Sequence, residues 1–234
     1  MLDLMSDVRG LQISGATFVS HFVHDLRACF RAIETLPDWI EEDLESVQEQ
    51  VPDDVFQYLK EIKVNARRAD RLINDMRELC EVDTRAEACV DLELGTAIRA
   101  YLLENPMPDG FEVKLDLADQ KLNLPKAGFD SVLAALLGNA VKHYGADRGT
   151  LYISNTNTHG ALVVGDDGVG VAHDFRSRIF DPFTMLRPRD VVEGSGLGLT
   201  IARRRVEGWG GTLRAVDHPV IKGAVFEIRF MDLT

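Results

Sequence analysis

Residues 164–171 read Val-Gly-Asp-Asp-Gly-Val-Gly-Val, an apolar strand that runs into a loop of aspartate and glycine. Taken alone, the loop favours a simple turn. Calcium is disfavoured, because an EF-hand loop needs further carboxylates and a final glutamate that are missing here. The glycines also let the backbone approach a flat ligand, and a buried Asp166 carboxylate accepts a hydrogen bond from an exocyclic amine such as that of adenine. The stretch thus leaves a turn and a nucleotide site open.

The helix predicted before it carries two polar side chains on an apolar background. Residues 136–144 read Leu-Leu-Gly-Asn-Ala-Val-Lys-His-Tyr, in which Asn139 and Lys142 are spaced to project on the same face. An amide oxygen can ligate Mg²⁺, and the lysine can neutralise phosphate charge. A surface pair of asparagine and lysine explains this segment equally well.

A second glycine-rich loop follows the first. Residues 193–199 read Glu-Gly-Ser-Gly-Leu-Gly-Leu and lead into a predicted helix, where backbone N–H groups can bind phosphate. The loop is no P-loop, since GxxxxGK[ST] is absent, and it does not open the βαβ unit that a dinucleotide fingerprint needs. Before it, residues 179–183 are typical of a packed turn, and the polar stretch with Arg187 and Arg189 is predicted to be a mobile lid.

In the first third of the chain, the spacing of apolar residues is typical of α-helices. Apolar residues step by threes and fours over residues 19–47 and again, in a narrower seam, over 56–79. Pro37 is expected to kink or interrupt the first helix, and Pro52 separates the two. The pattern predicts an antiparallel hairpin with two apolar stripes, which pairing with a second copy as a four-helix bundle would cover. We therefore expect a homodimer.

His24 and Asp25 lie side by side on the first of these helices. A lone helical histidine is ordinarily a surface residue, and His21 is interpreted as structural. The neighbouring carboxylate changes the chemistry, because it can hold the Nδ1 proton and leave Nε2 as a nucleophile for a phosphoryl group.

A polar linker at about residues 83–89 separates this hairpin from a region of mixed pattern, which places the domain boundary between 88 and 89. The predicted helices there are 94–103, 129–143 and 199–207, and the predicted strands are 111–117, 150–154, 161–164, 212–216 and 224–230.

The composition of the chain indicates which partners and which cellular location to expect. The chain has 234 residues and a formal charge of −12, which argues against a nucleic-acid binder. Its three cysteines are odd in number and form no CxxC, so neither a disulfide framework nor a zinc site is indicated, and a reducing, cytoplasmic location is expected. Nothing in the sequence is typical of a signal peptide or a membrane span, so no membrane contact is expected.

Five segments follow one another in a fixed order: His-Asp-Leu-Arg at 24–27, Asn-Ala-x-Lys-His at 139–143, Asp-Asp-Gly-x-Gly at 166–170, Phe-Asp-Pro-Phe at 180–183 and Gly-x-Gly-Leu-Gly-Leu at 194–199. This order resembles the histidine, asparagine, first glycine, phenylalanine and second glycine boxes of sensor histidine kinases, most closely their phytochrome-like branch. The resemblance implies an α+β chain, in which residues 1–88 form the dimerisation and phosphoacceptor hairpin. Residues 89–234 would form an ATP-binding α/β sandwich of the Bergerat or GHKL type, shared with DNA gyrase.

The resemblance also implies roles for single residues. His24 would be the phosphorylated histidine and Asp25 its orienting base, while Asn139 would hold Mg²⁺ and Asp166 would read adenine. The other implied nucleotide-binding positions are Lys142, His143, Gly168, Gly170, Gly194, Gly196, Leu197 and Gly198. The implied activity is ATP-dependent autophosphorylation, followed by transfer to an aspartate of a response-regulator receiver domain.

The sequence departs from the family pattern at several positions. Cys29 stands where a proline is usual, which weakens an expected kink, and Ala28 stands where Thr or Asn positions a hydrolytic water. Weak phosphatase activity toward the regulator is therefore expected. Ala135 and Met185 replace a usual asparagine and arginine, which predicts reduced nucleotide affinity.

Two other functions are weighed against this one. The first is a non-catalytic phosphorelay or scaffold protein with a degenerate ATP-binding domain, against which both intact glycine loops count. The second is an ATPase or serine kinase of the same sandwich fold, which the helical hairpin and His24-Asp25 disfavour.

Overall fold

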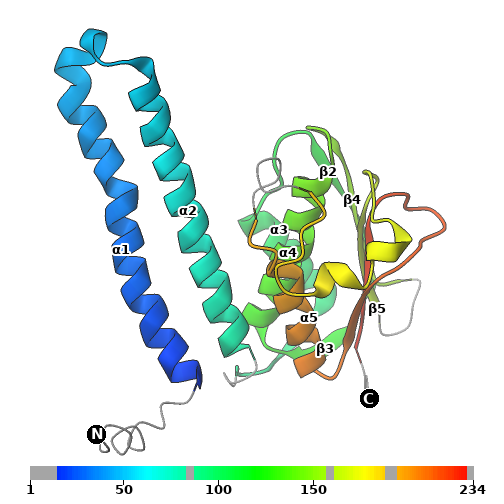
Figure 1. Cartoon of the computed structure of the whole chain (residues 1–234). Coiled ribbons are helices and arrows are strands. Elements are labelled where there is room, and N and C mark those ends of the chain that lie inside the picture. Colours follow the sequence, from blue (N-terminus) through cyan, green and yellow to red (C-terminus); the bar gives the residue numbers. More distant parts are fainter. Residues whose placement is uncertain (1–14, 83–86, 157–160, 188–193, 231–234) are drawn as a thin grey trace, which may run out of the picture. The chain divides into compact units, whose positions relative to one another are not determined.

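The structure, a computed structural model, describes the backbone of residues 15–82, 87–156, 161–187 and 194–230. The chain divides into two compact units between Thr84 and Arg85. Each unit is shown in Figure 1.

The first unit is a helical hairpin. Helix α1 (Gly15–Leu44) is followed by the short 3-10 helix η2 (Glu45–Gln50) and by α2 (Asp53–Glu81), and the two long helices lie antiparallel and side by side (Figure 1). In α2 the buried residues Leu59, Ala66 and Ile73 recur every seven positions, which keeps one narrow seam against α1.

The expected interruption at Pro37 is wrong, because α1 continues through this residue to Leu44. Proline removes one backbone hydrogen bond of the helix, and Pro37 is buried within α1.

The second unit contains a five-stranded sheet in the order β2-β4-β5-β7-β6. Its strands are β2 (Phe111–Asp116), β4 (Gly149–Ser154), β5 (Ala161–Asp166), β6 (Thr212–Ala215) and β7 (Val225–Arg229). β2 runs parallel to β4, and the remaining neighbours are antiparallel. The strands predicted at 150–154 and 161–164 are confirmed as β4 and β5, and they pair antiparallel.

Three helices cover one face of this sheet (Figure 1). They are α3 (Leu94–Glu104), α4 (Lys126–His143) and α5 (Gly198–Gly208). The core between the layers is formed by α4 side chains such as Phe129 and Leu136, which are fully buried, and by sheet residues such as Ile153 and Phe226. The expected α+β fold, a helical hairpin followed by a two-layer sandwich, is confirmed.

Four short elements were not anticipated. β1 (Val90–Glu93) and β3 (Lys121–Leu124) pair antiparallel as a separate two-stranded sheet, and the 3-10 helices η3 (His173–Phe175) and η4 (Arg178–Phe180) follow β5. Elements of three or four residues are too short to show a period in the sequence.

The start of the second unit is held by an ion pair. The Glu87 carboxylate lies 2.9 Å from the Arg205 guanidinium of α5, and both side chains are largely buried. A Cβ at Gly128, in the first turn of α4, would lie 2.9 Å from Glu87 Oε2 and 3.0 Å from the Trp209 ring. Glu87 therefore already packs into the second unit, although it falls before the boundary expected at 88/89.

Candidate functional site

Asp166 is the last residue of β5, a strand on which every residue is buried. Its side chain is itself buried, with 4% of the residue's surface exposed. One carboxylate oxygen, Oδ1, accepts the backbone N–H groups of Gly168 at 2.9 Å and Ala224 at 3.1 Å. Burial raises the pKa of Asp166, and these two N–H groups oppose the rise. Because both donors bind the same oxygen, Oδ2 is left to accept a hydrogen bond from a ligand.

The glycines around Asp166 are required by close contacts. A Cβ at Gly168 would lie 2.9 Å from the Tyr144 ring and 3.0 Å from Asp166 Oδ1. Gly170 has φ +71°, and its Cβ would lie 3.1 Å from the Gly223 carbonyl oxygen. Gly223 is the tightest of the three, because its Cβ would lie only 2.1 Å from Asp166 Oδ1. Gly223 was not predicted from the sequence, although its position directly before a predicted strand was an available signal.

Tyr144 and Asp167 form a second contact that the sequence did not reveal. The Tyr144 hydroxyl donates to Asp167 Oδ1 at 2.5 Å, and the Thr150 N–H donates to the same oxygen at 2.8 Å. Burial acts to raise the pKa of Asp167, but the hydrogen bonds from Tyr144 and Thr150 outweigh it and lower that pKa. The Tyr144 ring also covers Gly149, where a Cβ would meet it at 2.0 Å. The end of α4 is thereby fixed to the Asp166 loop.

The polar residues predicted on α4 lie toward this fixed end. Asn139 is half-buried, Lys142 is exposed and His143 is half-buried. Burial lowers the pKa of His143, and the positive charges of Arg187 and Lys142 lower it further. His143 is therefore neutral at pH 7 and offers one donor and one acceptor nitrogen.

Gly145 marks where three segments converge. It has φ +93°, and its Cβ would lie 3.4 Å from Val169 of the Asp166 loop and 3.7 Å from Arg187 Nη2. The structure thus brings together the end of α4, the Asp166 loop and the first arginine of the polar stretch that was predicted to be a lid. Arg189 of that stretch lies outside the described residues.

The second glycine loop runs into α5. The Leu197 N–H donates to Ser195 Oγ at 3.1 Å, Leu197 is fully buried, and the helix begins at Gly198. Gly196 has φ +75°, and its Cβ would lie 2.8 Å from the backbone of Phe183, itself at φ 62°. By contrast, a Cβ at Gly194 or Gly198 would meet nothing within 4 Å among the described residues. The packing of the described chain therefore does not explain why these two positions are glycine.

Thr200 is a further buried polar residue, which was not predicted from the sequence, and it lies in the first turn of α5. Its hydroxyl donates to the Phe180 carbonyl at 2.9 Å, which ties the phenylalanine segment to the helix that follows the second glycine loop.

The backbone of His24 and Asp25 lies within α1, as expected, but their side chains lie outside the described residues, as does that of Ala28. Their roles stay predictions. Among the residues that the structure describes, no group of three or more His, Cys, Asp and Glu side chains could hold a metal ion. Magnesium at Asn139 fits only as an ion that a single amide oxygen shares with nucleotide phosphates and water, the coordination Mg²⁺ commonly takes.

Comparison with known proteins agrees with this geometry. Residues 126–234 match the family described as histidine kinase-, DNA gyrase B-, and HSP90-like ATPase. The chain is 27% identical to the signal transduction histidine-protein kinase AfsQ2 of Streptomyces coelicolor over 96% of this chain and 43% of that protein. It is 30% identical to the sensor protein ChvG of Rhizobium meliloti over 92% of this chain and 39% of that protein. The chain is a sensor histidine kinase core.

Solved structures agree on the fold of this kinase core. Full-length ShkA in complex with AMPPNP aligns with 91% of this chain and 45% of that chain, at a TM-score of 0.66 and 21% identity. The Acinetobacter baumannii histidine kinase AdeS aligns with 83% of this chain and 94% of that chain, at a TM-score of 0.54 and 19% identity.

The kinase core spans about two fifths of the length of the relatives AfsQ2 and ChvG. Its placement in the phytochrome-like branch stays a prediction. Within the part of the chain that the structure describes, no helix is long and apolar enough to cross a membrane.

Proposed function

We propose that this chain transfers the γ-phosphoryl group of ATP to His24 and then to an aspartate of a response-regulator receiver domain. The observation that carries the proposal is the Asp166 site, a buried carboxylate with one oxygen held by backbone N–H groups and close-packed glycines on both sides. A buried carboxylate charge costs free energy, and a ligand that donates a hydrogen bond to the carboxylate offsets this cost. The exocyclic amine of adenine is such a ligand.

The remaining nucleotide contacts follow from where each side chain lies. Lys142 and neutral His143, at the end of α4, bind phosphate and ribose oxygens. The backbone of the Gly168–Gly170 and Gly194–Gly198 loops, with the buried Leu197 between the last two glycines, approaches the phosphates at the start of α5. Mg²⁺ held by Asn139 supplies charge neutralisation on the phosphate oxygens when bound.

The phosphoryl acceptor is the Nε2 nitrogen of His24. Asp25 holds the Nδ1 proton, which keeps Nε2 unprotonated and nucleophilic, and it stabilises the positive ring as the phosphorus–nitrogen bond forms. ADP leaves with the electron pair of the broken bond. The phosphohistidine then donates its phosphoryl group to the regulator's aspartate, and with Ala28 one turn further along α1, hydrolysis of the phosphorylated regulator is slow.

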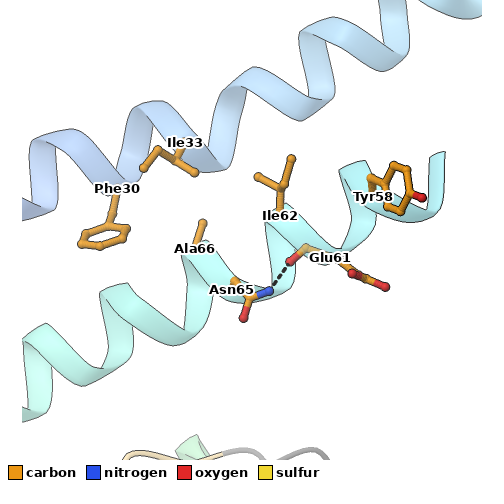
Figure 2. A pocket seen from close by; sticks show the side chains of 7 residues that line it. All are labelled: Phe30, Ile33, Tyr58, Glu61, Ile62, Asn65 and Ala66. Atoms are coloured by element: carbon orange, nitrogen blue, oxygen red, sulfur yellow. Dashed lines mark hydrogen bonds between the residues drawn. The ribbon is translucent and has the colours of Figure 1, made fainter. Parts of the chain in front are cut away.

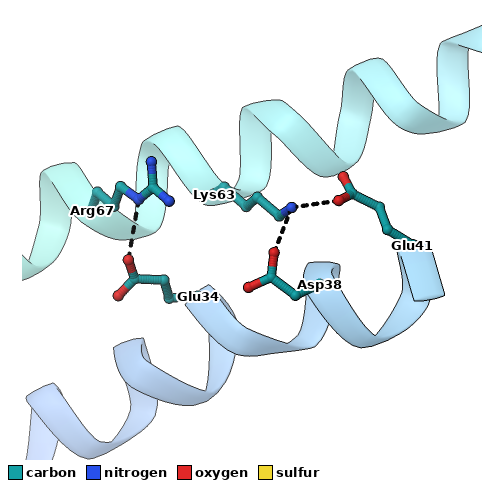
Figure 3. A network of polar contacts seen from close by, with 5 residues as sticks. All are labelled: Glu34, Asp38, Glu41, Lys63 and Arg67. Atoms are coloured by element: carbon teal, nitrogen blue, oxygen red, sulfur yellow. Dashed lines mark hydrogen bonds and ion pairs between the residues drawn. The ribbon is translucent and has the colours of Figure 1, made fainter.

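We also propose that the chain acts as a homodimer, since the two sides of the α1–α2 seam differ in chemistry. One side is closed by ion pairs. Lys63 Nζ lies 2.6 Å from both Asp38 and Glu41, and Arg67 Nε lies 3.1 Å from Glu34 (Figure 3). The hydrogen bonds to Asp38 and Glu41 raise the pKa of Lys63, so it stays charged.

The other side is an open apolar groove. It is lined by Phe30, Ile33, Tyr58, Glu61, Ile62, Asn65 and Ala66 (Figure 2). Ile33, Tyr58 and Ile62 expose 41%, 59% and 42% of their surface, and Leu36 and Ile40 continue the exposed stripe along α1. An apolar stripe of this length fits a second copy of the hairpin in a four-helix bundle.

The oligomeric state of Ile62→Glu tests the homodimer, with the exposed Tyr58→Phe as the matched control. We expect light scattering to give the mass of a dimer for the wild type and the control, and that of a monomer for Ile62→Glu. A monomeric wild type would contradict the proposal.

A cytoplasmic location is supported by the three cysteines, which are all free. The scaffold alternative is not favoured, because the Asp166 site and both glycine loops are intact.

Labelling with γ-³²P ATP and Mg²⁺ tests the kinase proposal, comparing the wild type with His24→Ala. Label that is acid-labile, alkali-stable and absent from the variant is the expected result. His21→Ala is the matched control and should keep the label. Label that survives in His24→Ala would refute the assignment of the acceptor. No label in a wild type that binds ADP would favour the scaffold function.

A further inference from the structure

The Arg176 side chain forms hydrogen bonds to two loops of the second unit, and it lies outside the five sequence motifs. It follows η3, and its Nε donates to the Val171 carbonyl at 3.2 Å. Its Nη1 and Nη2 donate to the two carboxylate oxygens of Asp217, each at 2.7 Å. Val171 lies in the loop that follows Asp166, and Asp217 lies near the start of the loop between β6 and β7. One side chain therefore ties both loops with three hydrogen bonds.

The two tied loops meet at Asp166. Each gives one backbone N–H to Asp166 Oδ1, from Gly168 on one side and Ala224 on the other. The Gly223 N–H donates to the Asp166 carbonyl at 2.9 Å, and a Cβ at Gly170 would lie 3.1 Å from the Gly223 carbonyl oxygen. The spacing of the loops thus sets the orientation of the buried carboxylate.

Internal hydrogen bonds connect the part of the β6–β7 loop that lies between Asp217 and Gly223. His218 Nδ1 accepts the N–H groups of Val220 at 3.3 Å and Ile221 at 3.1 Å, which closes the loop into a compact turn, and Ile221 is buried. The bidentate arginine–carboxylate pair at the start of the loop is strongly directional.

We propose that Arg176 and Asp217 are positioning residues that set the affinity of the Asp166 site for the adenine base. The inference rests on the proposed function of Asp166. Asp217 is 82% exposed at its side chain, and an exposed pair adds little to the stability of the whole fold. Its loss therefore changes nucleotide affinity more than it changes unfolding.

The test measures the Kd of ADP with Mg²⁺ by calorimetry on the full chain. The variants are Arg176→Leu, which removes all three bonds, and Asp217→Asn, which keeps the shape and removes the charge. Arg229→Gln is the matched control, because Arg229 makes a bidentate pair with Glu227 on the same strand, at 2.7 and 3.2 Å, and joins no loops.

We expect the Kd to rise about tenfold in Arg176→Leu and about threefold in Asp217→Asn, the loss of roughly one charged hydrogen bond or less. The double variant should bind no more weakly than Arg176→Leu, and Arg229→Gln should bind as the wild type does. In the labelling assay, the KM for ATP should rise while kcat is unchanged.

Several results would overturn the inference. A Kd within twofold of the wild type in both variants would do so, as would an equal change in Arg229→Gln or a loss of kcat with an unchanged KM. If Arg176→Leu does not fold, Asp217→Asn decides alone, since its side chain is exposed and its shape is kept. A wild type that does not bind ADP would instead refute the proposed function itself.

Discussion

The two glycine loops of the second unit differ in what requires their glycines. In the Asp166 loop, Gly168 and Gly170 face close neighbours within the chain, as does Gly223 across from them. In the second loop, Gly194 and Gly198 face none among the described residues. Packing therefore requires the glycines of the first loop and also Gly196 of the second, whereas Gly194 and Gly198 are the open positions that the proposed approach of a nucleotide would use. Stability measurements and binding measurements should separate the two loops.

Gly223→Ala should have the largest effect. Its Cβ would lie 2.1 Å from Asp166 Oδ1 and 2.4 Å from the Asp166 carbonyl oxygen, so the strand end or the loop must move. We expect the free energy of unfolding in urea to fall by about 3 kcal/mol and ADP binding to be lost. Gly208→Ala is the control, since its Cβ meets nothing within 4 Å. Equal stability of the two variants would contradict the idea that packing fixes this loop.

Asp166→Asn should separate binding from stability at the same site. The amide can still present an oxygen to the Gly168 and Ala224 N–H groups, but its own donors would then face the amine of the proposed adenine ligand. We expect the affinity for ADP to fall by about 10- to 100-fold, the loss of a hydrogen bond to a charged group. The melting temperature at pH 7 should not fall.

The pH dependence of that variant has a definite sign. Because burial raises the pKa of Asp166 in the folded chain, the folded state binds this proton more tightly than the unfolded chain does. The wild type therefore loses stability at this group as pH rises from the ordinary value of 3.8 through the folded pKa. In thermal unfolding between pH 4 and 8, the melting temperature of Asp166→Asn should rise relative to that of the wild type as pH increases. A melting temperature that falls relative to that of the wild type would show that the charge of Asp166 stabilises the fold.

Tyr144→Phe should have a smaller effect, confined to stability. It removes the hydroxyl that donates to Asp167 and leaves the ring against Gly149 and Gly168. We expect a loss of about 1 kcal/mol in the free energy of unfolding and an unchanged Kd for ADP. Tyr152→Phe, on the neighbouring strand β4, serves as the control. A large change in the Kd would instead place the Tyr144 hydroxyl at the nucleotide.

Gly198→Ala should change stability least. The added Cβ has open space at the first residue of α5, and alanine favours the helix, so the free energy of unfolding should stay the same or rise by up to about 1 kcal/mol. ADP affinity should nevertheless fall several-fold, because the methyl group occupies the approach to the helix start. An unchanged affinity for ADP would contradict the proposed difference between the two glycine loops.

Local pattern was enough to predict most elements. The apolar period of residues 129–143 predicted α4, and the β-rich composition of residues 150–154 and 161–164 predicted strands β4 and β5. The contacts that build the site could not be predicted from local pattern, because they join residues that lie far apart in the sequence. Ala224 binds Asp166 across 58 residues, and the roles of Gly223, Tyr144 and Arg176 arise only when distant loops meet. The interruption predicted at Pro37 was wrong because tertiary packing, which local sequence pattern does not show, buries this residue within a continuous α1.

The Glu87–Arg205 pair has a consequence for engineered chimeras. Arg205 lies on α5, about 10 Å along the helix from Gly198, where the second glycine loop ends. A foreign helical hairpin fused just before Glu87 would keep the native anchor, whereas a fusion at the 88/89 boundary suggested by the sequence would delete it. The deletion would remove the Glu87 carboxylate from beside Arg205 and Gly128, and we expect a chimera joined there to begin with a less firmly held α5.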